Sequence, residues 1–317
     1  MKYNYSLIIL NWKRPKNVIE IINKVYDYPY IDEIIISNGH PNTILTFTEL
    51  SKIRSFDDTI NNKYYGLDLR FLRGVSAKNN KLIIMDDDIV IDHSNLTKLL
   101  THYEKNPNKL VGIEGRNMEH DYHYGKVGWK SVECDIVLTR LVVCDKVLCE
   151  LFFRCKPIIE HVYKQGVPYG NGEDIFLSFI AKLFYKVEKH TLVIGLNIKE
   201  LPNNNSIHMT TTHIPYRKHL CEYLKLNREL LRNVIHNQNS YLTIQQKPEP
   251  PKIVSPTIIQ QKTKPSKIIS RTFRQAYTKH PVHYNTSIKK KEPSSNVNAQ
   301  TDVKYIKVGN KYIIRKK

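Results

Sequence analysis

Short apolar runs, each closed by polar residues, recur through the first part of the chain. Residues 3–10, Glu33–Ile36 and Lys81–Met85 predict buried strands, because each run is short and rich in aliphatic residues. Between them, Asn17–Val25 and Leu69–Ala77 predict helices. Apolar strands that alternate with helices are typical of a parallel sheet covered on both faces. The pattern predicts an α/β fold with a mixed, mostly parallel sheet and helices on both faces.

The pattern is less regular further along the chain. Lys109–Ile113 and Asp135–Leu138 predict strands, whereas Glu173–Phe184 and His219–His236 predict helices. No internal repeat is present in the sequence. We therefore expect one domain over residues 1–240.

Three polar clusters directly follow the predicted strands. They are Asn11-Trp12-Lys13-Arg14, Ser37-Asn38-Gly39 and Asp86-Asp87-Asp88. Ligands of open α/β sheets bind at the carboxyl ends of the strands. The three clusters are therefore predicted to converge on one ligand site.

The aspartate triplet is the strongest chemical signal among these clusters. Asp86 and Asp88 point to the same side if the backbone is extended. Adjacent carboxylates repel one another, and a hard cation such as Mg²⁺ or Mn²⁺ offsets that repulsion with oxygen ligands. A solvated acidic turn is the alternative, and the position after an apolar strand favours the metal site.

A second acidic pair, Glu173-Asp174, follows Asn171-Gly172. One interpretation is structural, because Asn171 can cap the predicted helix and acidic residues favour its first turn. The other places a carboxylate in the pocket as a base or as an electrostatic partner of the acceptor. The residues by themselves leave both open.

Several cationic side chains are further candidates for binding a diphosphate or completing a metal shell. His208 and His213 lie in a polar stretch that Arg217 follows. Arg14 ends a predicted strand at the ligand edge, whereas Arg70 and Arg73 lie on a predicted helix. Isolated His and Arg residues are commonly solvated, which is the alternative for each of them.

The net charge of +19 is concentrated in the last quarter of the chain. Residues 245–317 contain 17 Lys or Arg against 3 Asp or Glu, and they hold 7 of the 15 prolines. Such a segment cannot bury enough apolar surface to offset its ordering entropy. We expect a Pro- and Lys-rich flexible linker over 241–303 and a β-hairpin over 304–317, the whole forming a largely disordered basic tail with an anionic partner.

Cysteine usage and hydropathy point to a soluble protein of a reducing compartment. The five cysteines form no Cys-x-x-Cys pair, which predicts reduced, buried thiols. No apolar stretch reaches the roughly 18 residues of a transmembrane span, and the first apolar run is too short for a signal peptide. We expect a cytoplasmic protein. Its Lys-, Asn-, Ile- and Tyr-rich composition is typical of an AT-rich genome, such as a viral one.

The order of these motifs resembles the nucleotide-sugar half of GT-A (Rossmann-like) glycosyltransferases, in particular the exostosin-like group, glycosyltransferase family 64. The resemblance covers roughly residues 5–230. The matching segments, in chain order, are Asn11–Pro15, Ser37–Gly39, Leu69–Leu72, Asp86–Asp88, Asn106–Gly112, Tyr122–Gly125, Leu138–Leu141 and Asn171–Ile175.

The resemblance implies a GT-A fold, a UDP-sugar donor and a Mn²⁺ ion, with Mg²⁺ as the alternative. It places Asp86 near the ribose and Asp88 on the metal, and Asp174 near the reacting sugar. His213 matches a diphosphate or metal contact. The predicted catalytic residues are Asp174 and Glu173, and the predicted metal ligands are Asp88, Asp86 and His213. The predicted nucleotide-binding residues are Asn11, Arg14, Asn38, Arg70, Arg73, Asp86, Asp87, His213 and Arg217.

The predicted reaction is metal-dependent transfer of a hexose or N-acetylhexosamine from the UDP-sugar to a hydroxyl of a glycan, glycoprotein or glycolipid. One rival is a nucleotidyltransferase, but Asn11–Pro15 lacks the Gly-rich phosphate loop expected after its first strand. A second rival is a nucleic-acid-binding protein that acts through the basic tail.

Overall fold

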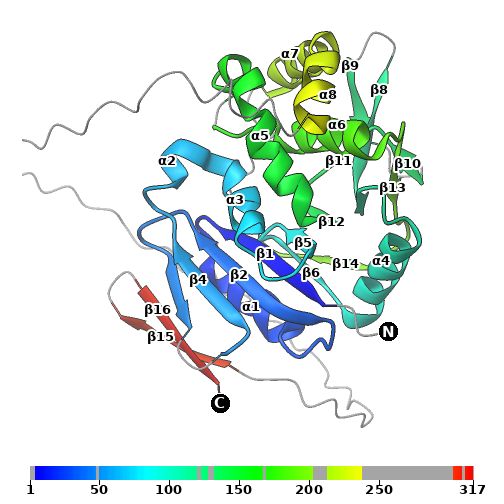
Figure 1. The fold of residues 1–317 in the computed structure, drawn as a ribbon. Helices are drawn as coiled ribbons and strands as arrows, with labels where there is room; N and C mark the ends of the chain where they lie inside the picture. The colour runs from blue at the N-terminus through cyan, green and yellow to red at the C-terminus, as the bar shows by residue number, and fades with distance from the viewer. Residues whose placement is uncertain are drawn as a thin grey trace, which may run out of the picture. The chain divides into compact units, whose positions relative to one another are not determined.

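The fold is taken from a computed structural model of the chain (Figure 1). The structure describes residues 4–47, 50–119, 123–127, 132–166, 169–202, 213–237, 303–308 and 311–316. The predicted linker over 241–303 lies outside the described residues, apart from its last position.

The described residues form strands and helices in mixed order along the chain. The strands are β1 (Tyr5–Asn11), β2 (Ile31–Asn38), β3 (Ile44–Phe47), β4 (Ile53–Asp57), β5 (Lys81–Met85), β6 (Ile89–Ile91), β7 (Val111–Gly112), β8 (Gly115–Glu119), β9 (His123–Val127), β10 (Glu133–Cys134), β11 (Ile136–Val137), β12 (Leu141–Asp145), β13 (His190–Leu192), β14 (Ile198–Glu200), β15 (Val303–Val308) and β16 (Lys311–Lys316). The helices are α1 (Pro15–Val25), α2 (Asn62–Tyr65), the 3-10 helix η1 (Gly66–Asp68), α3 (Leu69–Val75), α4 (His93–Lys105), α5 (Lys146–Tyr163), α6 (Glu173–Tyr185), α7 (His213–Leu226) and α8 (Arg228–His236).

An eight-stranded mixed sheet in the order β10-β13-β7-β12-β5-β1-β2-β4 forms the centre of the fold. Strands β4, β2, β1 and β5 run parallel, and β12 is inserted antiparallel between β5 and β7. At the far end β13 is parallel to β7, and β10 is antiparallel to β13. The predicted α/β class with a mixed, mostly parallel sheet is confirmed.

Each central strand sends alternate side chains into two separate cores, because successive residues of a strand point to opposite faces. Ile8, Ile35 and Ile84 pack in one core with residues of α3, α5 and α6. Their neighbours Ile9 and Ile36 pack in the other core with residues of α1 and α4. This two-sided burial explains why the strands are apolar throughout, and it confirms that helices cover both faces.

The parallel strands end together at one edge of the sheet. Asn11 is in register with Asn38, and Asn38 is in register with Asp57 on β4. Strand β5 ends at Met85, so the aspartate triplet begins at the same edge. The predicted convergence of the polar clusters at the carboxyl ends of the strands is confirmed.

Three predicted elements of the less regular part are wrong in extent. The strand predicted over 109–113 is the two-residue β7. The helix predicted over 219–236 starts earlier, at His213. It is interrupted at Asn227, so two helices, α7 and α8, are present. The Asn227 side chain donates a hydrogen bond of 2.9 Å to the Tyr223 carbonyl and so competes with the helical backbone pattern. The strand predicted over 135–138 is the two-residue β11, which pairs with β8 outside the central sheet.

Two observations bear on the environment of the chain. All five cysteines are buried free thiols, as predicted. Among the described residues, no helix is both long enough and apolar enough to cross a membrane.

The two strands β15 and β16 pair antiparallel.

Candidate active site

The aspartate triplet connects β5 to β6, and Asp87 and Asp88 form a turn rather than the extended backbone considered above. The Asp86 amide donates a hydrogen bond to the Arg140 carbonyl at 2.9 Å, which fixes the backbone where the strand ends. The Asp86 side chain remains 34% exposed, whereas those of Asp87 and Asp88 are 9% and 12% exposed. Asp86 is therefore the carboxylate of the triplet that is most open to a ligand.

Arg14 lies between β1 and α1 and partly neutralises the two more buried aspartates. Pro15 at the first position of α1 presets the helical backbone, which holds Arg14 at the junction of strand and helix. The Arg14 guanidinium lies 2.5 Å from Asp87 and 3.4 Å from Asp88. Arg14 thus contacts two of the three carboxylates, and the third, Asp86, is contacted by Arg70 at 3.0 Å.

Asp87 is the carboxylate of the triplet whose pKa is raised most clearly by its surroundings. Burial, opposed by Arg14 and reinforced by the neighbouring carboxylates of Asp86 and Asp88, raises the pKa of Asp87 to about 7. Its Oδ2 atom is buried without a hydrogen-bond partner among the described residues. Burial and Asp86 also raise the pKa of Asp88. A cation at this edge would reduce the repulsion between the carboxylates and would compensate for the hydrogen bond that Asp87 Oδ2 lacks.

The donor chemistry of the triplet fits a hard divalent cation. Mg²⁺ is commonly held by one or two carboxylates together with substrate phosphates, and Mn²⁺ accepts the same oxygen ligands. Among the described residues, no three His, Cys, Asp or Glu side chains form a group that could hold a metal by themselves. A cation bound here would thus need ligands from its substrate, with Asp86 and Asp88 as the protein carboxylates.

Arg70 connects the triplet to the second acidic pair. Its buried guanidinium donates to Asp86 at 3.0 Å and to the Thr139 carbonyl at 3.2 Å, and it lies 3.8 Å from a carboxylate oxygen of Glu173. Although burial lowers it, the Asp86 and Glu173 carboxylates raise the pKa of Arg70 above its ordinary value. Arg70 is therefore a permanent positive charge between the two clusters.

Glu173 and Asp174 form the first turn of α6, and both are buried. Glu173 accepts a hydrogen bond of 2.8 Å from the Thr139 hydroxyl. Burial and the adjacent Asp174 raise the pKa of Glu173 to about 7. Glu173 can thus hold or release a proton near neutral pH, which is the property of a general acid or base.

Arg217 on α7 neutralises Asp174. Its guanidinium donates to both carboxylate oxygens of Asp174 and to the Asn171 side chain at 3.2 Å. It also lies 4.6 Å from the ring centre of Tyr124 on β9. The helix α7 therefore closes over the start of α6 through a buried, two-pronged ion pair.

His213 is the first residue of α7, and its Nδ1 atom lies 3.2 Å from the Asn171 amide nitrogen. This contact places His213 beside the Asn171–Asp174 segment. Its contact with a metal or a diphosphate stays a prediction. His208, its alternative, lies outside the described residues.

Asn11 and Asn38 are buried at the ends of β1 and β2 and bond to each other at 2.8 Å. The Asn38 amide also binds both backbone groups of Leu45 and the Phe56 carbonyl. Its hydrogen-bonding capacity is thus used to join β2 with β3 and β4. The structure gives both asparagines a role in joining the strand ends at this edge of the sheet, and direct nucleotide contact stays a prediction.

Arg73 is placed apart from the triplet in its hydrogen bonding. It forms a two-pronged ion pair with the fully buried Asp58, and its guanidinium stacks 4.0 Å from the centre of the Phe56 ring. Asp58 also accepts a hydrogen bond from Ser37 at 2.5 Å. In these contacts Arg73 connects α3 to the ends of β2 and β4.

Several residues of this network were not singled out as site candidates. Arg140 pairs with Glu114 and Glu200 next to the triplet, and Thr139 binds both Arg70 and Glu173. Tyr124 contacts the Arg217 guanidinium. The segments Tyr122–Gly125 and Leu138–Leu141 were matched only through the family resemblance, because Thr139, Arg140 and Tyr124 form no charge cluster or motif of their own.

The fold and the site define a class of protein. Paired carboxylates and buried arginines at the carboxyl edge of a mostly parallel sheet suit a substrate that carries a diphosphate. Residues 5–237 match the glycosyl transferase family 64 domain, and the chain belongs to that family. It is therefore a glycosyltransferase by class. A comparison with curated proteins gave no match.

Proposed function

We propose that this glycosyltransferase moves a sugar from a UDP-sugar to an acceptor hydroxyl with the help of Mn²⁺ or Mg²⁺. The sugar is a hexose or an N-acetylhexosamine, and the acceptor is a glycan, glycoprotein or glycolipid. The single observation that carries the proposal is Arg70, whose guanidinium contacts Asp86 at 3.0 Å and lies 3.8 Å from Glu173. This arginine brings the diphosphate-binding end and the sugar-binding end of one substrate into a single site.

The triplet and Arg14 form the diphosphate end in this proposal. When bound, a divalent cation held by Asp86 and Asp88 would neutralise charge on the leaving diphosphate. Arg14 keeps Asp87 and Asp88 oriented through its contacts of 2.5 Å and 3.4 Å. Arg70 adds positive charge that needs no reorganisation during transfer, because it is held by the Thr139 and Leu67 carbonyls.

Glu173 and Asp174 form the sugar end. Asp174 lies beside the reacting sugar, where Arg217 holds it in place and balances its charge. Glu173, with a pKa raised to about 7 by burial and Asp174, accepts the proton that the acceptor hydroxyl loses as its oxygen bonds to the sugar and the diphosphate leaves. The Thr139 hydroxyl orients this carboxyl group through its bond of 2.8 Å.

A donor screen tests the proposal with the full chain. Release of the nucleotide is followed from UDP-glucose, UDP-galactose, UDP-N-acetylglucosamine, UDP-N-acetylgalactosamine and one GDP-sugar, each with Mn²⁺, with Mg²⁺ and with a chelator. We expect turnover of one UDP-sugar that stops on chelation.

The matched variants are Asp88→Ala and Glu150→Ala, of which the second removes an exposed carboxylate on α5. Asp88→Ala should abolish the metal-stimulated turnover, whereas Glu150→Ala should leave it unchanged. Turnover that survives both chelation and Asp88→Ala would contradict the metal dependence. A GDP-sugar as the preferred donor would contradict the nucleotide assignment.

The basic tail enters this proposal only as an accessory segment with an anionic partner. Its linker lies outside the described residues. Sugar transfer and binding of an anionic polymer are measured in parallel across a salt series. Binding of the polymer by the tail should weaken steeply with salt, which separates it from sugar transfer.

A further inference from the structure

A buried ion pair lies behind the site, where η1 meets α5. Asp68 is fully buried and accepts hydrogen bonds of 2.6 Å from the Lys156 ammonium and 2.6 Å from the Tyr163 hydroxyl. None of these three residues contacts the aspartate triplet in the described hydrogen bonds. Both oxygens of Asp68 are hydrogen-bonded, and a buried ion pair with such partners holds its elements in one geometry, because breaking it leaves an uncompensated buried charge.

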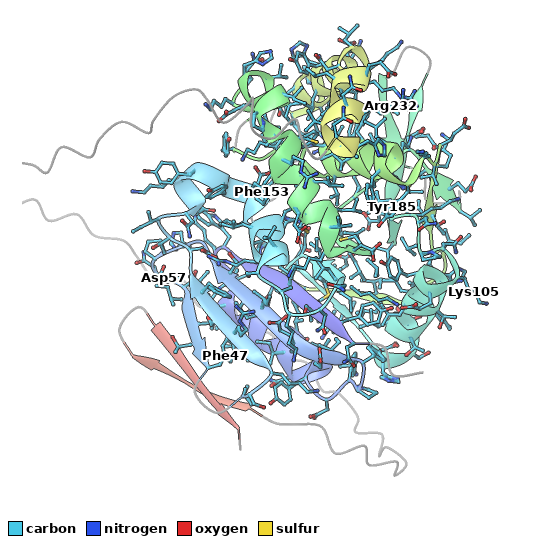
Figure 2. All side chains as sticks on the ribbon, viewed as in Figure 1. Phe47, Asp57, Lys105, Phe153, Tyr185 and Arg232 are labelled. Atoms are coloured by element: carbon cyan, nitrogen blue, oxygen red, sulfur yellow. The ribbon has the colours of Figure 1, made fainter. Side chains whose placement is uncertain are left out.

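Aromatic rings surround the Lys156 ammonium. It lies 4.9 Å from the ring centre of Tyr169, 5.3 Å from Tyr65 and 5.7 Å from Tyr163. Phe153, labelled in Figure 2, completes the set at 5.8 Å and packs edge-on against Tyr65. Such rings attract a cation and exclude water, so Lys156 is held in one position.

The backbone segments on the two sides of this ion pair interlock. The Leu67 amide donates to the Tyr169 carbonyl at 3.3 Å. Gly66 and Gly170 both have positive φ, and a Cβ on Gly66 would lie 2.0 Å from the Tyr169 carbonyl oxygen. A Cβ on Gly170 would lie 2.7 Å from the Leu67 amide nitrogen. Only glycine permits this close approach at both positions.

The interlocked segments lead directly to the two partners of the central ion pair. Arg70 follows η1 and donates through Nε to the Leu67 carbonyl at 3.2 Å. Glu173 follows the turn at Gly170, whose carbonyl oxygen lies 3.0 Å from the Tyr163 hydroxyl. Movement of either segment would therefore change the separation of Arg70 and Glu173.

We propose that Asp68, Lys156 and Tyr163 form a clamp that sets the distance between Arg70 and Glu173 and thereby acts as a positioning device for sugar transfer. The clamp touches neither the donor nor the acceptor. This inference rests on the proposed function for its effect on turnover, whereas the clamp itself is a statement about the fold.

Tyr163→Phe is the sharpest test, because it removes one hydroxyl and leaves the charged pair in place. Tyr103→Phe is the matched control, since the Tyr103 hydroxyl donates to Asp145 at 2.5 Å and Tyr103 is equally buried on α4. We expect both variants to lower the Tm by similar amounts. Only Tyr163→Phe should lower kcat, by about tenfold, because small displacements of catalytic groups strongly reduce the rate of the chemical step.

A double-mutant cycle with Arg70→Met separates positioning from general destabilisation. If the clamp acts through Arg70, Tyr163→Phe should change kcat by less than about twofold in the Arg70→Met background. The Tm losses of the two variants should likewise add to more than the loss of the double variant. Equal effects of Tyr163→Phe in both backgrounds, on kcat and on Tm, would overturn the proposal.

A substitute variant and a second readout keep the test decisive. Glu173→Gln replaces Arg70→Met in the cycle if the latter variant does not fold. If the wild-type chain turns over no nucleotide sugar, the proposed function fails, and the Tm cycle alone decides whether the clamp exists.

Discussion

Arg70 contacts both acidic clusters, the triplet Asp86-Asp87-Asp88 and the pair Glu173-Asp174. The two clusters differ in exposure and in the partners of their carboxylates. Arg14 is shared by two aspartates of the triplet, and Asp86 stays 34% exposed. The second pair is buried, with Arg217 on Asp174 and Thr139 on Glu173. The triplet keeps one carboxylate open to solvent, whereas both carboxylates of the second pair are buried and hydrogen-bonded. In the proposed function, the triplet binds the diphosphate end of the substrate and the second pair positions the sugar end.

Removing Asp174 should have the largest effect on stability. Asp174→Ala leaves the Arg217 guanidinium buried and without its two-pronged partner, which should cost about 3–5 kcal/mol in the free energy of unfolding. Urea denaturation measures it, and Asp88→Ala provides the comparison. A loss below about 1 kcal/mol would show that the second pair is not the closed, preorganised cluster described above.

Removing Asp88 should have the largest effect on metal-dependent turnover. Asp88→Ala should lower kcat by about 10²–10³-fold, as expected when preorganised charge stabilisation is lost. Stability should change little, because burial and repulsion from Asp86 already raise the pKa of Asp88. Steady-state kinetics with Mn²⁺ and calorimetric metal titration check this. Unchanged Mn²⁺ affinity in the variant would argue against the triplet as the binding cluster.

The pH dependence of stability should report Glu173. Its folded pKa of about 7 lies above the ordinary value of 4.5, so the folded protein binds more protons between these values. The free energy of unfolding should therefore fall as pH rises from about 4.5 to 7, by about 1–3 kcal/mol. Glu173→Gln should remove this part of the slope and be the more stable protein above pH 7. Identical slopes for both proteins, measured by urea denaturation, would place the raised pKa elsewhere.

The smallest effect is expected for Asp87→Asn. With its pKa raised to about 7 by burial, Asp87 is partly neutral at physiological pH, and the amide has the same shape. Stability should change by less than about 1 kcal/mol and kcat by less than about threefold. A loss as large as that of Asp88→Ala would make Asp87 a ligand rather than a structural member of the triplet.

The strands β1, β2 and β5 and the helices α1 and α3 were predictable because their signals are local, whereas β3, β4, β6 and α4 were not predicted. Lys81–Met85 is a strand with the predicted bounds, and the helix predicted from Leu69 begins at that residue. Both elements depend on runs of apolar side chains that can be recognised without knowledge of the rest of the chain. In contrast, the strand β12 was missed, because Leu141–Asp145 is preceded by the short, irregular pieces β7 to β11.

The sequence singled out candidate site residues but not the partners that they contact. The triplet was recognisable from its position after an apolar strand, and the second pair from its position before a helix. That Arg73 binds Asp58 while Arg70 binds Asp86 could not be predicted, because both arginines lie on α3 three residues apart. Their directions depend on how α3 packs against the sheet.

The sequence by itself determined the class of sheet, the edge at which its polar clusters meet, and the family to which the chain belongs. These properties follow from periodicity and from motif order, which are local and survive without a partner. Only the tertiary structure decided that Arg70 lies between Asp86 and Glu173, and that Arg217 closes over Asp174. Each of these contacts joins segments far apart in the chain, so its geometry depends on the packing of whole helices and strands.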